Sequence, residues 1–183
     1  MNNNKVLRAK NISKSFGEVQ ALKNVDFDLN KGEIHGLLGE NGAGKSTLMN
    51  ILYGLYKEDQ GEVYIEGEEV DFNSPLDSIK KGIGMIHQSS TLVPEFTALE
   101  NLILGTEGNK LSLELKDAEA KILEIQKEFG LKFPLNTKVK NLPAGIKQKV
   151  EIIRAIYRGA NILIFDEPTT SLVEDEFEQF LKS

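Results

Sequence analysis

The chain has 183 residues, enough for one domain with a full hydrophobic core, and its 40% hydrophobic and 27% charged residues are ordinary for a globular protein. The formal charge of −6 argues against a protein that binds nucleic acid by neutralising phosphates, and the absence of cysteine excludes disulfide scaffolds, thiolate metal sites and cysteine nucleophiles. No apolar run reaches the length of a membrane helix, and the N-terminus lacks the apolar core of a secretion signal. If the protein acts at a membrane, we therefore expect it to do so through a partner protein.

The first quarter of the chain is predicted to form strands and a helix around a glycine-rich turn. Residues 6–12 and 25–29 alternate roughly between apolar and polar side chains, which is typical of half-buried strands. Residues 34–38 are mostly apolar and predict a strand that runs into the glycine-rich turn. Residues 46–53 predict the helix that follows this turn.

Further short apolar segments predict strands. Residues 63–65 and 70–72 flank a polar stretch that contains Gly67, which predicts a hairpin. Residues 83–86 predict another short buried strand. Residues 162–165 are apolar on both faces, as in a central strand of a parallel sheet.

From about Thr91 the pattern becomes helical. Residues 144–157 predict a long helix, and an earlier amphipathic helix is predicted by apolar residues at spacings of three and four. The members of this core-facing stripe are Leu115, Ala118, Ile122, Ile125 and Phe129. Together the elements predict an α/β domain with a helical insertion at about residues 91–141.

One segment matches the pattern G-x-x-x-x-G-K-[ST] between a predicted strand and a predicted helix. Glycines let the backbone approach phosphate oxygens, successive N–H groups form an anion-binding nest, and the helix adds its unpaired amides. In this pattern Lys45 reaches the β- and γ-phosphates and the Ser46 hydroxyl binds magnesium. The predicted phosphate loop consists of Gly39, Glu40, Asn41, Gly42, Ala43, Gly44, Lys45 and Ser46.

Two carboxylates follow the apolar segment at residues 162–165. Open α/β sheets place their ligand chemistry at the carboxyl ends of strands, so Asp166 is in position to hold magnesium. Glu167 is then in position to orient or deprotonate the attacking water. Acidic residues after a buried strand are often only solvated, but together with the phosphate loop they favour a nucleotide hydrolase.

These segments resemble the nucleotide-binding domain of the ATP-binding cassette (ABC) ATPase superfamily, from about residue 5 to the C-terminus. The resemblance implies that Phe16 stacks on adenine. It also implies that Gln88 senses the γ-phosphate and magnesium and couples to the transport partner. Pro143, Ala144 and Gly145 stand where the family's signature motif contacts the nucleotide bound to a second domain.

The resemblance further implies which residues perform the chemistry. The implied catalytic residues are Glu167, Lys45 and Gln88, and the implied magnesium ligands are Ser46, Gln88 and Asp166. The residues implied to bind ATP are Phe16, Thr47, Gln88 and Asp166 together with the phosphate loop. The implied fold is an α/β P-loop NTPase core of the ABC type, with an antiparallel β subdomain and a helical subdomain at about residues 91–141. We expect one such domain over residues 5–183, lacking the family's final strands.

Two stretches, residues 92–105 and 150–160, resemble importers of simple sugars and nucleosides, and the stretch from Leu142 leans toward the nucleoside group. This implies the ATP-binding subunit of an importer, in which hydrolysis of Mg-ATP drives uptake of a simple sugar or nucleoside. The implied partners are a second nucleotide-binding domain (a homodimer or a tandem cassette), membrane permease subunits and, indirectly, an extracytoplasmic solute-binding protein. No nucleic acid is expected, and the implied location is the cytoplasmic face of the cell membrane.

The chain departs from the family pattern at several positions. Pro143 replaces the signature serine, so one hydroxyl and one backbone N–H are absent, and Ile146 replaces a polar residue. Val173 stands where the family usually has aspartate. The family also carries a histidine that contacts the γ-phosphate, but the 16 residues after Glu167 contain none. We therefore expect a chain that is C-terminally truncated relative to the family and that binds ATP with slow or absent hydrolysis.

Two alternatives stay open. The chain could be a nucleotide-binding module or fragment that is impaired in hydrolysis, although the presence of Glu167 counts against a degenerate site. It could also be a soluble ABC ATPase that serves translation or DNA repair. The acidic charge and the absence of a long coiled-coil insertion count against that reading.

Overall fold

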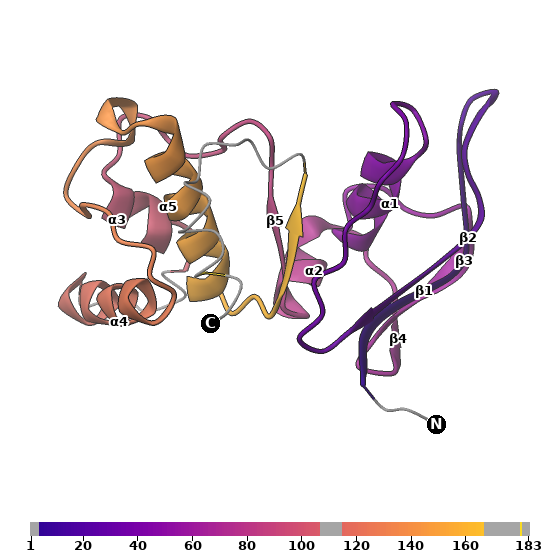
Figure 1. The fold of residues 1–183 in the computed structure, drawn as a ribbon, viewed down its shortest axis with the longest axis horizontal. Coiled ribbons are helices and arrows are strands. Elements are labelled where there is room, and N and C mark those ends of the chain that lie inside the picture. Colours follow the sequence, from indigo (N-terminus) through magenta and orange to yellow (C-terminus); the bar gives the residue numbers. More distant parts are fainter. Residues whose placement is uncertain (1–3, 107–114, 167–179, 181–183) are drawn as a thin grey trace. The chain divides into compact units, whose positions relative to one another are not determined.

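The computed structural model describes residues 4–106, 115–166 and 180. The chain divides into two compact units, Met1–Lys81 and Gly82–Ser183 (Figure 1). No helix in the described ranges is long and apolar enough to cross a membrane.

The first unit contains an antiparallel sheet with the strand order β2-β1-β3-β4. Its long strands confirm the predictions at residues 6–12 and 25–29, although both strands extend further than predicted. Alternate residues of β1 are buried at Leu7 and Ala9, as the apolar alternation requires. The strands are β1 (Lys5–Phe16), β2 (Val19–Asn30), β3 (Gln60–Ile65) and β4 (Glu68–Val70).

The predicted hairpin forms, but its turn is shorter than the sequence suggested. Val63 pairs with Val70 and Ile65 with Glu68, so β4 begins at residue 68 rather than 70. The two turn residues, Glu66 and Gly67, have φ values of 50° and 87°. Two consecutive left-handed residues form the tight turn that matches the twist of an antiparallel pair, which brings the second strand forward.

The strand predicted at residues 34–38 is wrong. None of the strands in the described part of the chain pairs with this segment, and Ile34 and Leu38 are 68% and 95% exposed. An apolar run predicts burial, but a strand also needs a neighbouring backbone to accept and donate its hydrogen bonds. The chain therefore enters the glycine-rich turn from an irregular segment.

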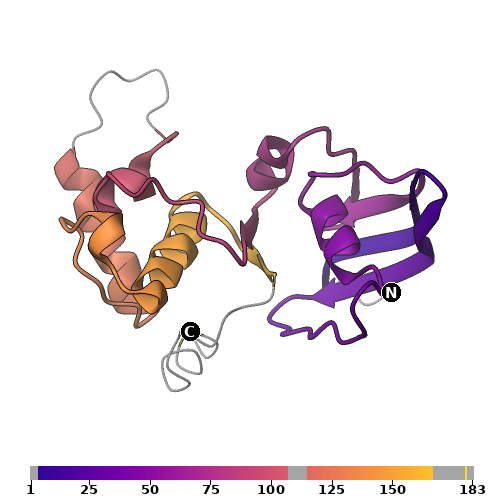
Figure 2. The same cartoon turned by 90° about the horizontal axis from the view of Figure 1, so that it is seen from above.

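Two helices accompany the first sheet. The predicted helix at residues 46–53 is confirmed as α1 (Lys45–Leu52), which lies beside the sheet in both views (Figures 1 and 2). Helix α2 (Pro75–Lys80) was not predicted; a proline opens it, where a missing N–H costs nothing. The Ser78 hydroxyl donates to the Tyr53 carbonyl oxygen at 2.7 Å and thereby connects α2 to the end of α1.

The second unit is built on a parallel strand pair, in which Ile83 pairs with Ile162 and Ile86 with Phe165. Both strands were predicted. Within the described ranges β6 has β5 as its one neighbour, so the predicted central position of residues 162–165 is not seen there. The elements of this unit are β5 (Ile83–Ile86), α3 (Ala98–Ile103), α4 (Leu115–Glu128), a 3-10 helix (Val139–Asn141), α5 (Ala144–Tyr157) and β6 (Ile162–Phe165).

Helix α5 lies between the strand pair on one side and α3 and α4 on the other (Figure 1). Gly84 makes this approach possible. A Cβ atom at Gly84 would lie 2.8 Å from the Ala155 Cβ and 3.0 Å from the Ala160 Cβ, both closer than ordinary van der Waals contact. A glycine in the middle of β5 therefore allows the helix to pack closely on the sheet.

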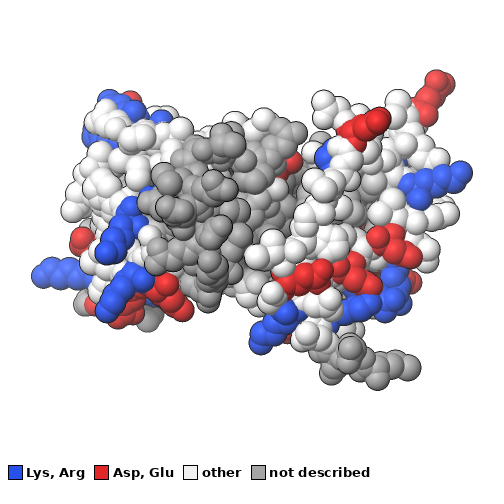
Figure 3. All heavy atoms as spheres, viewed as in Figure 1, with Lys and Arg blue, Asp and Glu red and all other residues white. Residues whose placement is uncertain are grey.

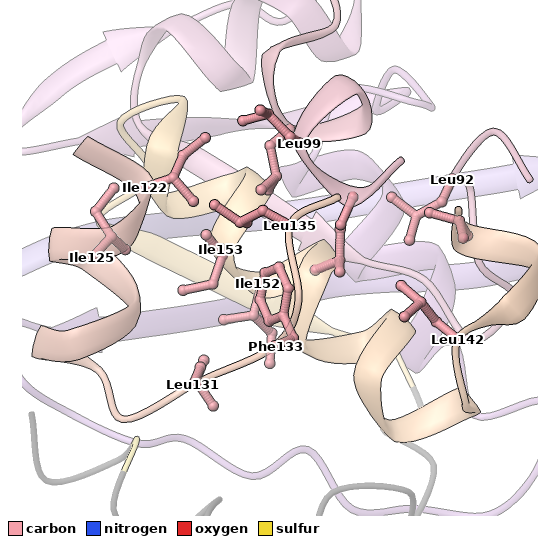
Figure 4. Packing of buried hydrophobic residues seen from close by; sticks show 14 of the residues in the cluster. Leu92, Leu99, Ile122, Ile125, Leu131, Phe133, Leu135, Leu142, Ile152 and Ile153 are labelled. Carbon is pink, nitrogen blue, oxygen red and sulfur yellow. The ribbon is translucent and has the colours of Figure 1, made fainter. Parts of the chain in front are cut away.

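The core of the second unit fills the space between its helices. Figure 4 shows side chains of α3, α4, α5 and the segment at residues 131–135 turned toward one another. The predicted stripe on α4 is confirmed at Ala118, Ile122 and Ile125, which are buried, and Phe129 is partly buried against the same cluster. The prediction is wrong at Leu115, which is 56% exposed because it begins the helix at the end of this contact.

Leucine truncations in this unit test which positions form the core. Leu102 is fully buried and Leu123 is 50% exposed. Leu102→Ala should lower the free energy of unfolding by about 2–5 kcal/mol, because it removes buried methyl groups and leaves a cavity. The matched Leu123→Ala variant should lower it by less than about 1 kcal/mol. Urea unfolding of the two variants measures the difference, and equal losses would contradict this assignment of the core.

Candidate functional site

The glycine-rich turn at residues 39–46 leads directly into α1. Gly42 and Gly44 adopt left-handed conformations with φ values of 84° and 89°, and Gly44 is the N-cap of the helix. The Ala43 N–H donates to the Glu40 carbonyl oxygen at 3.2 Å, and the Leu48 N–H donates to that of Gly44 at 2.9 Å. The first amides of an α-helix have no carbonyl partner within the helix, so this turn presents N–H groups suited to an anion.

Gly44 also anchors the turn to the sheet. A Cβ atom at this position would lie 2.6 Å from the Ala21 carbonyl oxygen and 2.7 Å from the Leu22 Cδ2 atom of β2. Backbone atoms cannot give way as a flexible side chain can, so glycine is required here for space as well as for its positive φ. The close contact with β2 therefore positions the turn and the start of α1.

Lys45 supplies a positive charge at this turn. Its Nζ atom donates to the carbonyl oxygens of Gly39 and Glu40, at 2.8 Å each. The ammonium group is thus held over the backbone of its own turn, at the end of the helix that favours anions. Ser46 is exposed and Thr47 is partly buried in the first turn of α1. This arrangement agrees with the predicted phosphate loop.

Phe16 ends strand β1 as part of an aromatic pair. Its ring is 44% exposed and packs edge-to-face against Tyr56, with 5.2 Å between the ring centroids. The Lys14 Nζ atom lies 5.7 Å from the Phe16 centroid and forms a 2.8 Å ion pair with Asp59. Hydrogen bonds from Lys14 and from the Ser15 N–H hold the pKa of Asp59 below its ordinary value. An exposed ring supported in this way can stack on a planar base.

Strand register brings Phe16 near the phosphate loop. Leu22 lies against Gly44, at the place where a side chain on that residue would project. Leu22 also pairs with Lys14 of the neighbouring strand β1. Phe16 lies two residues further along β1, a distance of about 7 Å at the ordinary rise of a strand. The end of β1 that carries Phe16 and the part of β2 that contacts the glycine-rich turn thus belong to the same strand pair, and the roles of Phe16 and of the turn in nucleotide binding stay predictions.

The second unit brings Gln88 and Asp166 to one sheet edge. Strands β5 and β6 are parallel, and their last residues, Ile86 and Phe165, are paired. The Asp166 N–H donates to the Ile86 carbonyl oxygen at 3.1 Å, so Asp166 and the segment leading to Gln88 leave the sheet together. Gln88 is exposed and Asp166 is partly buried. The position of Asp166 at the end of a buried strand agrees with the sequence, while the roles of Asp166 and Gln88 stay predictions.

The chemistry of three side chains fits the predicted magnesium ion. The Ser46 hydroxyl, the Gln88 amide and the Asp166 carboxylate all offer oxygen atoms, the ligand type that Mg²⁺ prefers. Magnesium in nucleotide sites usually takes only one or two protein ligands and completes its shell with water and phosphate. The described residues contain no cluster of three or more His, Cys, Asp or Glu side chains, and the magnesium site stays a prediction.

The predicted signature segment forms the start of α5. Pro143 is the N-cap of this helix, and its carbonyl oxygen accepts from the Lys147 N–H at 3.0 Å. Ala144 is exposed and Gly145 is partly exposed in the first turn, where helix amides are available. Ile146 packs partly against the core cluster, which accounts for an apolar residue at this position.

Some predicted residues lie outside the described ranges, namely Glu167, Val173 and the rest of residues 167–179. Conversely, the structure adds Lys14 and Tyr56 to the surroundings of Phe16. The contact between Phe16 and Tyr56 joins residues far apart in sequence and follows no local pattern, whereas Lys14 lies two residues before Phe16 on the same strand, a spacing that places both on one face.

Charges of both signs cover the surface of the described residues. On the face shown in Figure 3, Lys and Arg side chains lie among Asp and Glu side chains. Among the described residues on that face, no broad basic area of the kind used by nucleic-acid-binding proteins is visible.

Comparisons with known proteins agree with this geometry. A family model described as ABC transporter matches residues 22–170. The chain is 46% identical over its whole length to the nucleoside import ATP-binding protein NupA of Lactococcus lactis, of which it covers 36%. It is 44% identical over 94% of its length to the ribose import ATP-binding protein RbsA of Streptococcus agalactiae, of which it also covers 36%. The chain thus spans about a third of the length of these curated relatives.

A solved structure gives the same fold. It is a dimeric ATP-binding cassette in a post-hydrolysis state, bound to ADP and Pi. The likeness has a TM-score of 0.78 and 31% sequence identity, and it covers 96% of this chain and 80% of the other.

Two glycine substitutions in the phosphate loop separate strain from steric conflict. Both Gly42 and Gly44 have positive φ, but a Cβ at Gly42 would meet nothing within 4 Å. Gly42→Ala should therefore lower the free energy of unfolding by about 1–2 kcal/mol, because alanine is strained in a left-handed conformation. Gly44→Ala should lower the free energy of unfolding further, by about 1–3 kcal/mol more than Gly42→Ala does, because its Cβ would overlap the backbone of β2. Urea unfolding compares the two variants, and equal costs would contradict the contact described here.

Proposed function

The chain belongs to the ABC transporter family, and from this premise we propose that it is the ATP-binding subunit of an importer. In this proposal it binds Mg-ATP and couples ATP hydrolysis to the uptake of a simple sugar or nucleoside. The observation that carries the proposal is the phosphate loop, where Gly44 packs against β2 and Lys45 lies at the start of α1. Backbone amides, a lysine charge and a helix N-terminus together suit the triphosphate of a nucleotide.

The residues of the chain divide the work on ATP between them. The Phe16 ring stacks on the adenine base, and the loop amides with Lys45 neutralise the β- and γ-phosphates. Glu167 accepts a proton from the water that attacks the γ-phosphorus, and the bond between that phosphorus and ADP breaks. Gln88 orients this water beside the γ-phosphate. Ser46, Gln88 and Asp166 would hold a magnesium ion, which would supply positive charge that offsets the charge of the phosphates.

A second cassette completes the site. The first turn of α5, with the amides of Ala144 and Gly145, faces the γ-phosphate held by the partner cassette. Pro143 removes one hydroxyl and one N–H from this contact, which weakens it by roughly 1.5–3 kcal/mol for each hydrogen bond lost to a charged group. The similar cassette of known structure is a dimer, which supports this part of the proposal.

The nature of the transported solute follows from the relatives. The printed names of the two relatives refer to import of nucleosides and of ribose. These names support a simple sugar or a nucleoside as the solute, taken up by permease subunits that receive it from an extracytoplasmic binding protein. The cassette acts at the inner face of the membrane, and Gln88 relays the state of the nucleotide to the permease.

Removal of the Lys45 charge tests nucleotide binding. Lys45→Gln should raise the Kd for Mg-ATP at least about tenfold, because a charge-assisted contact to phosphate is lost. Lys80→Gln is the matched control, since this lysine is 76% exposed on α2 of the same unit, and its Kd should stay unchanged. Isothermal titration calorimetry measures both constants. Equal affinity of the two variants would contradict the role of the phosphate loop.

Neutralisation of Glu167 tests hydrolysis. In the natural full-length protein, Glu167→Gln should lower the rate of phosphate release from Mg-ATP by about 10²–10⁴-fold, the usual contribution of a general base. The Kd for Mg-ATP should change little. Glu124→Gln, an exposed position on α4, serves as the control. Unchanged phosphate release in Glu167→Gln would refute the assigned base, and binding without release in the unaltered protein would favour a nucleotide-binding module.

A further inference from the structure

A buried carboxylate lies two helical turns beyond the start of α5. Glu151 is 6% exposed, although its neighbours Ile152 and Ile153 are fully buried apolar residues of the core. A buried carboxylate costs free energy unless it is paired, and an apolar residue at such a position often stabilises a protein as well or better. The presence of glutamate here therefore calls for a role other than general stability.

The Glu151 carboxylate binds the segment that follows Gln88. Its Oε1 atom accepts from the Thr91 N–H at 2.8 Å and from the Ser90 hydroxyl at 3.0 Å. The Thr91 hydroxyl lies 3.3 Å from the same oxygen. Ser90 is two residues beyond Gln88, so the carboxylate fixes the backbone immediately after the glutamine that faces the nucleotide in the proposed function.

Arg154 completes this arrangement from the next turn of α5. Its guanidinium donates to the Oε2 atom of Glu151 and also to the Thr91 hydroxyl oxygen. The Arg154 side chain is 15% exposed. Both oxygens of Glu151 thus have hydrogen-bond partners, and Thr91 is held by its backbone through Glu151 and by its side chain through both residues.

Further hydrogen bonds connect the rest of residues 90–97 to the helices of the second unit. The fully buried Asn101 accepts from the Val93 N–H at 2.7 Å and donates to the Thr97 carbonyl oxygen at 2.9 Å. The Lys140 N–H donates to the Pro94 carbonyl oxygen at 2.9 Å. Residues 90–97 are therefore joined to α3 and α5 at several points, and the first of these joints after Gln88 is made by Glu151.

From these contacts we propose that Glu151, with Arg154, is a positioning residue that holds Gln88 in register with the first turn of α5. The inference rests on the proposed function and deepens it. Glu151 lies seven residues after Ala144, which at 3.6 residues per turn places both on nearly the same side of the helix. A shift of the Gln88 segment is thereby transmitted to the helix that serves the partner cassette, without direct contact between Glu151 and nucleotide.

Amide hydrogen exchange of the nucleotide-free protein tests the local contact. Glu151→Gln should raise exchange at residues 90–92 by at least about tenfold, because hydrogen bonds to a charged acceptor are weakened. Thr91→Val should raise it in the same direction with a smaller effect, and this variant keeps the size of the side chain. The control Glu124→Gln neutralises an exposed carboxylate of the same unit and should leave this segment unchanged.

Turnover of the natural full-length protein tests the positioning role. Glu151→Gln should lower kcat for phosphate release about tenfold while KM for Mg-ATP stays within about threefold, because the contact acts on the reacting geometry rather than on binding. Unchanged exchange at residues 90–92 in both variants overturns the proposal. Equal exchange increases over the whole unit, or a loss of Mg-ATP binding in Glu151→Gln, also overturn it, since either reveals a general structural role.

The result that would refute the proposed function differs from the result that would refute the role of Glu151. If the unaltered protein does not bind Mg-ATP, the proposed function is refuted. The exchange result for nucleotide-free Glu151→Gln remains valid in that case and decides whether Glu151 orders residues 90–92.

Discussion

The parallel pairing of β5 with β6 is the constraint on which the second unit depends. Parallel neighbours need a long crossover, and here residues 87–161 make it and supply every described helix of the unit. Because both strands end at the same edge, Asp166 and the segment that leads to Gln88 leave the sheet there despite their separation along the chain. The crossover must also return against the sheet, which it does through α5 at Gly84.

The first unit depends on a different constraint, because the backbone N–H groups of its glycine-rich turn must be exposed and also held in a fixed position. A turn whose N–H groups are to bind a phosphate cannot be covered by side chains, so its position must be fixed by contacts on its other side. Gly44 provides this support by its contact with the backbone of β2, and the register of β1 with β2 then sets where Phe16 lies. Phe16 and the glycine-rich turn are thus both positioned by the same antiparallel strand pair.

The local backbone around the candidate site was predictable because it depends on short patterns, while the binding and catalytic roles of its residues stay predictions. A glycine turn before a helix and carboxylates after an apolar strand are read from neighbouring residues, and Lys45 and Asp166 lie as those patterns require. Features that depend on long-range pairing were not predictable. Residues 34–38 have the composition of a strand without a strand partner in the described ranges, and Leu115 has helical spacing without a neighbour to cover it. Tyr56 packs against Phe16 from a position forty residues further along the chain.

The sequence by itself determined the type of most local elements, the position of the glycine-rich turn and the identity of the chemical groups, since propensity, periodicity and glycine conformations act over a few residues; it missed α2 and wrongly predicted a strand at residues 34–38. Only the tertiary structure decided which of these groups meet. It paired the ends of β5 and β6, so that Asp166 bonds to the backbone of Ile86, and it turned Glu151 toward Ser90 and Thr91 rather than toward solvent. The physical reason is that a buried polar group takes whichever partners the packing brings within hydrogen-bond distance, and packing joins residues that no local pattern relates.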